Sequence, residues 1–268
     1  MRGMATDRVW IRTAIIAVAL CAATAETALA QRGRGGGAPQ PQRSPREAAH
    51  FDLTGYWVPL ITEDWAERVA PPHKGDYRGV PLSPAGRQVA DTWDAAADVA
   101  AGNQCRAFGV GGLTRMPVRL HITWQDDATL KIESDAGMQT RLLQFDSAKV
   151  DASAAPTLQG QSLAVWEKVR QARGFGPAPS VGPGNLKVVT TRLLPGYLRR
   201  NGASYSGATT VTEYFHRHAD FGREYFTVDT VVDDPEYLTR SYVTTTHFQR
   251  EADASKWAPE PCEVLAAP

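Results

Sequence analysis

Short runs of apolar and β-branched residues alternate with turn-forming residues along most of the chain after residue 51. The clearest stretch contains three such runs, 118–124, 129–134 and 138–145, which are separated by Gln-Asp-Asp-Ala and Asp-Ala-Gly. Runs of this length, rich in β-branched and aromatic residues, favour strands, and the separators are typical of turns. The pattern predicts an antiparallel meander.

Five further runs have the same character, and they span residues 56–61, 186–194, 209–217, 224–232 and 241–250. Together they make about eight strands, the number that closes a small barrel and removes the exposed sheet edges. The sequence therefore predicts an all-β fold for residues 51–268. We expect one antiparallel up-and-down barrel of about eight strands, with one or two short helices in insertions.

The insertions are residues 62–104 and 146–184. In the first, Ser83-Pro84 is a helix start that predicts a helix over 84–100, with Val89, Trp93 and Ala97 on one face. That face suits packing against one end of the barrel, and a ligand platform is the alternative. The second insertion could hold a short helix over 162–170, and long insertions often act as lids or binding loops. The Gly-rich segment 103–116 lacks the order of a phosphate-binding loop and is interpreted as a loop across the barrel mouth.

The first thirty residues have the features of a secretory signal peptide. Three arginines precede an apolar run, and Ala28-Leu-Ala30 matches a cleavage site. The alternatives are a membrane anchor, for which the run is short, and a lipid anchor through Cys21. Residues 31–50, rich in Gly, Pro and Arg, predict a flexible linker. We expect an exported protein, periplasmic or secreted, with no integral membrane segment after signal removal.

Charge and cysteine content further limit the possible partners and predict a covalent cross-link. The chain has 29 basic and 29 acidic residues, which argues against a nucleic-acid partner. Cys105 and Cys262 remain once the signal is removed, an even pair in an oxidising compartment. They predict a disulfide that ties the C-terminal tail to the start of the barrel; two free thiols are the alternative.

Gly55-Tyr56-Trp57 resembles the G-x-W signature that opens the first strand of lipocalin-like (calycin) barrels. The segment from Asp52 to Trp57 also resembles the start of a group of exported bacterial proteins of unassigned function, D-L-[TS]-G-x-W. The first resemblance implies that Trp57 closes one end of a barrel by packing under it. It also implies that the interior binds a small apolar or aromatic molecule.

Several polar residues interrupt otherwise apolar strands. Strand alternation places Glu213 on the same side as Val211 and Phe215, whereas His121 alternates with Leu120 and Ile122. The simplest interpretation is that each polar residue faces water. A sharper hypothesis is that some of them converge inside the barrel, where a His–carboxylate pair could act as acid and base. The catalytic candidates are His121, Glu213, Asp229 and His247, and the ligand-binding candidates are Trp57, Arg119, Trp124, Arg141, Arg192 and Tyr214.

Known metal-binding and catalytic motifs provide little support for a functional site in this sequence. His216 and His218 share one side of a strand, but the sequence supplies no third ligand, so a solvated hairpin end is the preferred interpretation. The sequence has no nucleophile elbow, no H-E-x-x-H motif and no dinucleotide fingerprint. We predict neither a metal site nor a cofactor.

Three functional classes follow, and the sequence does not indicate an oligomeric state. The first is a soluble barrel that binds a small apolar or aromatic molecule in its interior. The second is a cofactor-free isomerase, lyase or cyclase with a His–carboxylate pair inside the barrel. The third is a structural envelope protein with a filled barrel and an exposed apolar patch.

Overall fold

The computed structural model describes residues 43–171 and 180–264. The predicted signal peptide, residues 1–30, and most of the predicted linker lie outside the described residues. In the part of the chain that is described, no helix has the length and apolar character needed to cross a membrane.

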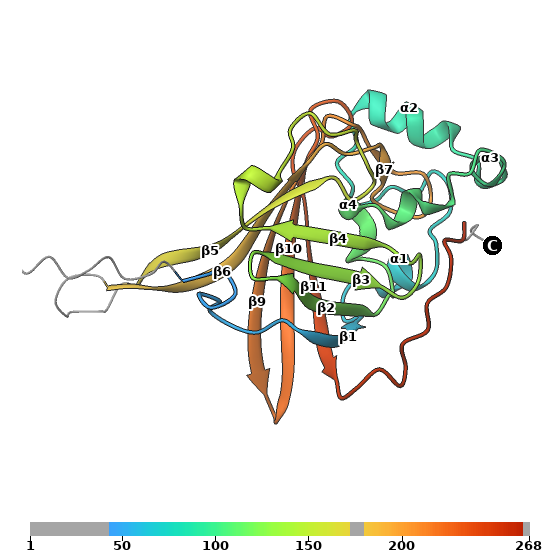
Figure 1. The fold of residues 1–268 in the computed structure, drawn as a ribbon. Coiled ribbons are helices and arrows are strands. Elements are labelled where there is room, and N and C mark those ends of the chain that lie inside the picture. The colour runs from blue at the N-terminus through green and yellow to red at the C-terminus, as the bar shows by residue number, and fades with distance from the viewer. Residues whose placement is uncertain (1–42, 172–179, 265–268) are drawn as a thin grey trace, which may run out of the picture. The chain divides into compact units, whose positions relative to one another are not determined.

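Nine strands form a closed barrel in the described residues (Figure 1). Their order around the barrel is β1-β11-β10-β9-β6-β5-β4-β3-β2, and β1 closes the ring by pairing with both β2 and β11. Each of the eight predicted runs contains a strand, so the prediction of a mainly β barrel is confirmed. The expectation of one or two short helices is wrong, because the described residues form four α-helices and two 3₁₀-helices. The strands are β1 Gly55–Leu60, β2 Leu120–Asp126, β3 Thr129–Ser134, β4 Thr140–Gln144, β5 Gln161–Gln171, β6 Ser180–Thr191, β9 Thr210–Asp220, β10 Arg223–Asp233 and β11 Tyr242–Glu251.

The prediction of eight antiparallel strands is wrong in two respects, and both concern β5. The segment expected to form a helix over 162–170 is a strand that pairs with β6 over its whole length. Ser162 and Ala164 are buried while Leu163 and Val165 are exposed, a period of two that outweighs the helical spacing of Leu163 and Trp166. β5 also runs parallel to β4, through a short pairing at Leu143–Ser162 and Gln144–Leu163. The barrel is therefore mixed.

The described part of the predicted linker, residues 43–50, packs on the barrel near this parallel pair. The indole N–H of Trp166 donates to the Pro45 carbonyl over 2.9 Å, and the Phe51 ring meets Trp166 edge-on at 5.1 Å. Phe145 stacks on the same indole at 5.6 Å. Because residues 43–50 pack on the barrel, the folded domain begins before residue 51. The aromatic cluster covers the place where β4 and β5 share few ladder hydrogen bonds.

Helices and a small hairpin, which we call the cap, cover the end of the barrel at which β9 and β11 begin (Figure 1). A second apolar cluster joins Val211 and Val232 of the barrel to Val110, Leu198 and Tyr205 of the cap. The elements of the cap are α1 Trp65–Val69, α2 Pro84–Thr92, α3 Ala95–Ala100, η1 Gln104–Phe108, α4 Val110–Leu113, β7 Gly196–Tyr197 and β8 Ser204–Tyr205. A further short helix, η2 Ser147–Lys149, follows β4.

The helix predicted over 84–100 begins as expected but is broken in the middle. The Ser83 hydroxyl accepts the Gly86 N–H at the start, whereas Trp93 has ψ of 139° and ends α2. The Asp94 side chain then caps α3. Because the break changes the helical phase, the predicted inward face is wrong: Val89 and Ala97 are exposed, while Gly86, Ala90 and Asp98 are buried.

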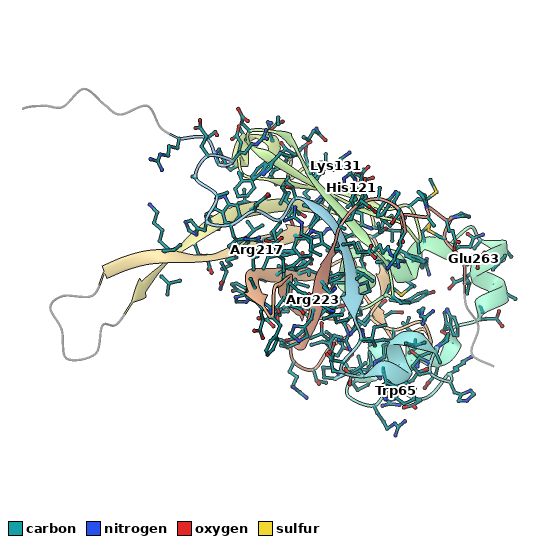
Figure 2. The ribbon with its side chains drawn as sticks, turned by 90° about the horizontal axis from the view of Figure 1, so that it is seen from below. Trp65, His121, Lys131, Arg217, Arg223 and Glu263 are labelled. Carbon is teal, nitrogen blue, oxygen red and sulfur yellow. A yellow bond between two sulfur atoms is a disulfide. The ribbon has the colours of Figure 1, made fainter. Side chains whose placement is uncertain are left out.

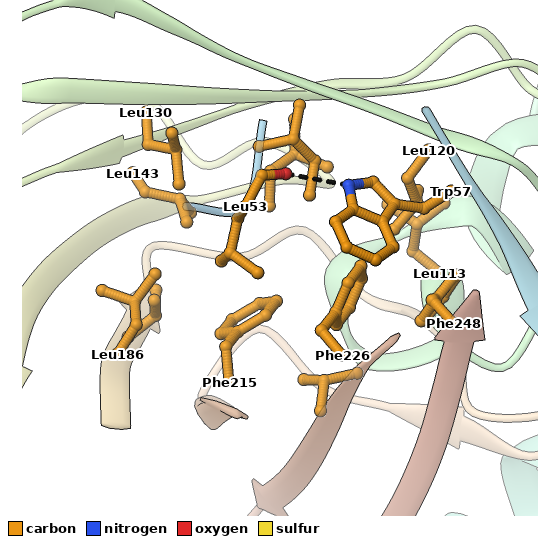
Figure 3. Close-up of a cluster of buried hydrophobic side chains, with 14 of the residues drawn as sticks. Leu53, Trp57, Leu113, Leu120, Leu130, Leu143, Leu186, Phe215, Phe226 and Phe248 are labelled. Atoms are coloured by element: carbon orange, nitrogen blue, oxygen red, sulfur yellow. Dashed lines mark hydrogen bonds between the residues drawn. The ribbon is translucent and has the colours of Figure 1, made fainter. Parts of the chain in front are cut away.

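The interior of the barrel is filled by packed side chains (Figure 3). Trp57 is fully buried, and its indole N–H donates to the Leu53 carbonyl over 2.8 Å. Phe226 packs edge-on against Trp57 at 4.8 Å and stacks on Phe248 at 4.7 Å. The guanidinium of Arg250 lies 5.8 Å from the Trp57 ring centroid.

A polar layer lies between the two apolar clusters. On β9 Glu213 stands between Val211 of the cap cluster and Phe215 of the barrel cluster, and Thr230 is its partner on β10. Glu213 accepts two hydrogen bonds from Arg141 of β4, at 3.0 and 2.5 Å, and both side chains are 1% exposed or less. Such bidentate pairing is what allows two charges to be buried together.

The predicted disulfide is present. Cys105 of η1 and Cys262 are joined, 157 residues apart in the chain. The bond fixes the C-terminal segment beside the cap.

Candidate functional site

The structure separates the four catalytic candidates. Glu213 lies inside the barrel, where it is bound to Arg141, whereas His121, Asp229 and His247 lie on the outer face of the sheet. The strand register explains this separation. Asp229 is paired with Tyr214 rather than with Glu213, so its side chain points to the opposite face of the sheet from that of Glu213. The predicted convergence of these residues inside the barrel is therefore wrong.

On the outer face the histidines have partners of their own. His121 stacks on Tyr56 with ring centroids 4.2 Å apart, and its Nδ1 is 3.4 Å from a Glu133 oxygen. Figure 2 labels His121 and, on the neighbouring strand, Lys131. Further round the sheet, Thr227 and His247 are in hydrogen-bond contact at 2.8 Å. These are cross-strand pairs on a half-exposed surface. They agree with the simpler interpretation given above, that the polar residues of the strands face water.

His216 and His218 do not form a metal site together. His216 Nε2 is 3.0 Å from Oδ2 of Asp229, whose Oδ1 accepts the Thr245 hydroxyl, and His218 stacks on Tyr225. Across residues 43–171 and 180–264, no group of three His, Cys, Asp or Glu side chains could hold a metal ion.

The six predicted ligand-binding residues are dispersed. Arg141 is bound to Glu213 and Trp57 belongs to the core, whereas Trp124 sits in the aromatic cluster beside Phe145. Arg119 is paired with Glu251, Arg192 donates to the Ala154 carbonyl, and Tyr214 lies on the outer face beside Lys187. They do not share a site.

A pocket with an unusual concentration of arginine lies instead in the cap. We call it the arginine pocket; Arg68, Arg115, Arg199 and Arg200 line it, together with Tyr197 and Gly112. Its empty space is about 370 Å³ including the open mouth. Arg68 belongs to α1 and Arg115 follows α4, while Arg199 and Arg200 occupy the turn between β7 and β8. Three segments far apart in the sequence therefore place four guanidinium groups around one space.

The charge balance differs among these arginines. Glu63 accepts from Arg68 at 2.6 Å and from Arg115 at 3.0 Å, and Asp64 accepts from Arg115 at 2.6 Å. Arg199 and Arg200 have no carboxylate oxygen within 4 Å in the part of the chain that the structure describes. Glu67 also lines the pocket. Desolvation lowers the pKa of both Arg200 and Arg68 from the ordinary value.

A second space adjoins the first, and we call it the aromatic pocket. It has about 260 Å³ of empty space including its open mouth, and its enclosed part has room for no more than about one water molecule. Its lining residues are Trp93, Ala107, Tyr197 and Val264 together with the polar Asn103, Gln104, Arg200 and Glu263. Ala107, Tyr197 and Arg200 line both spaces, so the two pockets share a wall. In Figure 2, Trp65 marks α1 and Glu263 marks the C-terminal segment.

Asp98 holds the two rings of the aromatic pocket in place. One of its oxygens accepts the indole N–H of Trp93 at 2.8 Å and the hydroxyl of Tyr197 at 2.5 Å. Burial, followed by the hydrogen bond to Asp98, raises the pKa of Tyr197 to about 12, so this hydroxyl stays a donor at neutral pH. The rings meet edge-on at 6.3 Å.

Asp98→Asn is expected to lower the free energy of unfolding by about 1–3 kcal/mol, because the oxygen that accepts both buried donors becomes either a neutral carbonyl, which is a weaker acceptor, or an N–H₂ group, which accepts neither. Urea denaturation measures the change. Asp127→Asn, a change at a carboxylate whose side chain is 74% exposed, is the matched control and should leave stability unchanged. Equal stability of both variants would contradict the positioning role of Asp98.

Two glycines let the walls approach one another. A Cβ at Gly202, where φ is +87°, would lie 2.3 Å from the Trp93 Cβ. A Cβ at Gly112 would lie 2.4 Å from the Tyr197 carbonyl oxygen. Any larger residue at either position would move a wall of the pockets.

Only part of these pockets is recognisable in the sequence. A ligand platform that includes Trp93 is one of the two interpretations of the helix predicted over 84–100, whereas no motif surrounds the arginines. Arg199-Arg200-Asn201-Gly202 was interpretable as a turn, but its proximity to Arg68 and Arg115 depends on the closed fold.

No protein-family model, curated protein or solved structure matches this chain.

Proposed function

We propose that the protein binds a small apolar or aromatic molecule, and that it does so in the aromatic pocket of the cap rather than in the barrel interior. The observation that carries the proposal is the aromatic pocket, a space open to solvent between Trp93, Tyr197 and Val264 that adjoins the arginine pocket. Aromatic and apolar side chains beside a few placed polar groups are typical of small-molecule sites. The ring of a ligand would lie in the open part of this space, against Trp93 and Val264. The filled interior of the barrel supplies a rigid base.

The resemblance to lipocalin-like barrels and the export of the protein belong to the same proposal. The buried Trp57 beneath the barrel cluster supports the first, although the parallel β4–β5 pair departs from an up-and-down barrel. The disulfide between Cys105 and Cys262 supports an oxidising compartment, periplasmic or extracellular.

A structural envelope protein is the second candidate. A filled barrel interior favours it, as does a row of exposed apolar side chains on β4 and β5: Leu142, Leu163, Val165 and Val169. The enzyme hypothesis required a histidine beside a carboxylate inside the barrel. Within the described residues the interior carboxylate, Glu213, has arginine as its charged partner.

Val264→Asp tests the binding proposal with little risk to folding, because Val264 lies in the C-terminal segment outside any strand. A charge on the wall should weaken binding of a neutral aromatic probe, 3-phenylpropanol, by about tenfold, given the cost of desolvating a carboxylate. Ligand-observed NMR titration measures the affinity.

The matched control is Val99→Asp, an equally apolar side chain on the exposed side of α3 that is 51% exposed. It should leave probe affinity unchanged. If the wild-type protein shows no saturable binding of 3-phenylpropanol or of its acid analogue up to the solubility limit, the binding proposal is rejected and the structural candidate gains support.

A further inference from the structure

We propose that the arginine pocket binds the anionic group of the ligand, so that the molecule recognised is a small apolar or aromatic acid, with a carboxylate as the simplest case. This inference rests on the proposed function, since the aromatic pocket would hold the body of the same molecule. The two pockets share Ala107, Tyr197 and Arg200, and Arg200 therefore stands where the body of a ligand would meet its charged group.

Arg200 carries the argument. Its side chain is only 6% exposed, yet the hydrogen bonds it makes to described residues are from Nη2 to the carbonyls of Arg68 and Val69. Buried charges in proteins are ordinarily paired with an opposite charge, because the desolvation of an unpaired ion costs several kcal/mol. The carbonyl oxygens supply partial negative charge only, and no carboxylate of the described residues, Glu263 of the aromatic pocket included, forms an ion pair with Arg200.

Two other guanidinium groups of the arginine pocket have unused donors. Arg68 is 3% exposed, and its Nη2 has no hydrogen-bond partner among the described residues. The same holds for Nη1 of Arg199, which is also buried. A planar carboxylate accepts guanidinium N–H groups in pairs, which makes arginine the residue suited to recognising it.

The structural alternative is that Arg200 only caps α1 through its two carbonyl contacts. That role accounts for Nη2 of Arg200 and leaves the unused donors of Arg68 and Arg199 unexplained. An anion between the three groups would supply acceptors to all of them. Glu67, the carboxylate that lines the pocket on α1, forms no ion pair with Arg199 or Arg200 in the described structure.

The size of the arginine pocket limits what it could accept. Its enclosed part has room for one or two water molecules and hence for a single small group. A carboxylate fits this description. The remainder of the molecule would extend past Arg200 toward Trp93.

A matched pair of ligands tests the inference. We compare 3-phenylpropionate with 3-phenylpropanol, which has the same ring and chain without the charge, by NMR titration of the full chain. The wild-type protein should bind the acid at least about tenfold more tightly, since hydrogen bonds to charged groups are the stronger kind. Arg200→Gln should remove that preference and retain binding of the alcohol.

Arg199→Gln is the second variant, because Arg199 is half-buried and makes no side-chain hydrogen bond to the described residues, so its removal carries little folding risk. It should reduce the preference several-fold. Arg240→Gln, at an exposed arginine that lines neither pocket, is the control and should keep the full preference.

The outcomes separate the two proposals. Equal affinity of the wild-type protein for acid and alcohol, or a preference that survives both pocket variants, would overturn the anion inference and leave the binding function intact. If neither compound binds, both proposals fail. A preference for the acid that is lost in both pocket variants and kept in the control supports both.

Discussion

Glu213→Ala is expected to lower the free energy of unfolding by about 3–5 kcal/mol, the largest effect of any single substitution considered for this chain. Glu213 is fully buried and accepts two hydrogen bonds from Arg141, which is 1% exposed. The substitution leaves the Arg141 guanidinium without a counter-ion in a dry interior. The nearest polar side chain on the neighbouring strand is Thr230, which carries no negative charge. Urea denaturation at neutral pH measures the loss.

The double variant Arg141→Met with Glu213→Leu separates charge from packing. It removes both charges together and keeps side chains of similar volume, so we expect a stability close to that of the wild type. Arg141→Met alone should be as destabilising as Glu213→Ala, because it leaves the Glu213 carboxylate buried without its counter-ion. If the double variant is as unstable as the two single ones combined, the pair contributes a net stabilisation and our account of the polar layer is incorrect.

Removal of the disulfide is the second large effect. Cys105→Ser with Cys262→Ser should lower the free energy of unfolding by roughly 4–5 kcal/mol in the chain-entropy description. The bond closes a loop between residues 157 positions apart, so it removes many conformations from the unfolded chain. Denaturation of the double variant beside the oxidised wild type measures the change.

The same variant should also lose affinity for the aromatic probe. Gln104 precedes Cys105, Glu263 and Val264 follow Cys262, and all three line the aromatic pocket. Without the bond the C-terminal segment is no longer fixed beside η1. An unchanged affinity for 3-phenylpropanol in the variant, measured where it is folded, would show that the tail is not needed as a wall of the pocket.

The alternation of apolar and polar residues was sufficient to locate eight of the nine barrel strands in the described residues, because a strand with one buried face has a period of two in its sequence. It also gave the correct inward face where that period was clean: Leu120 and Ile122 are buried, and so are Glu213 and Phe215. It failed at β5, where Leu163 and Trp166 had helical spacing and the deciding influence was pairing with β6. The disulfide was also predictable, since the expected removal of Cys21 with the signal peptide left Cys105 and Cys262 as the pair.

What the tertiary structure alone decided is which residues meet. Asp229 and His247 stood on strands like that of Glu213, and only the register between neighbouring strands put them on the outer face. Arg68, Arg115, Arg199 and Arg200 lie on segments more than a hundred residues apart at the extremes and have no common motif. Local sequence determines local structure through period and turn chemistry, whereas a pocket built from several loops depends on barrel closure, which no single segment encodes.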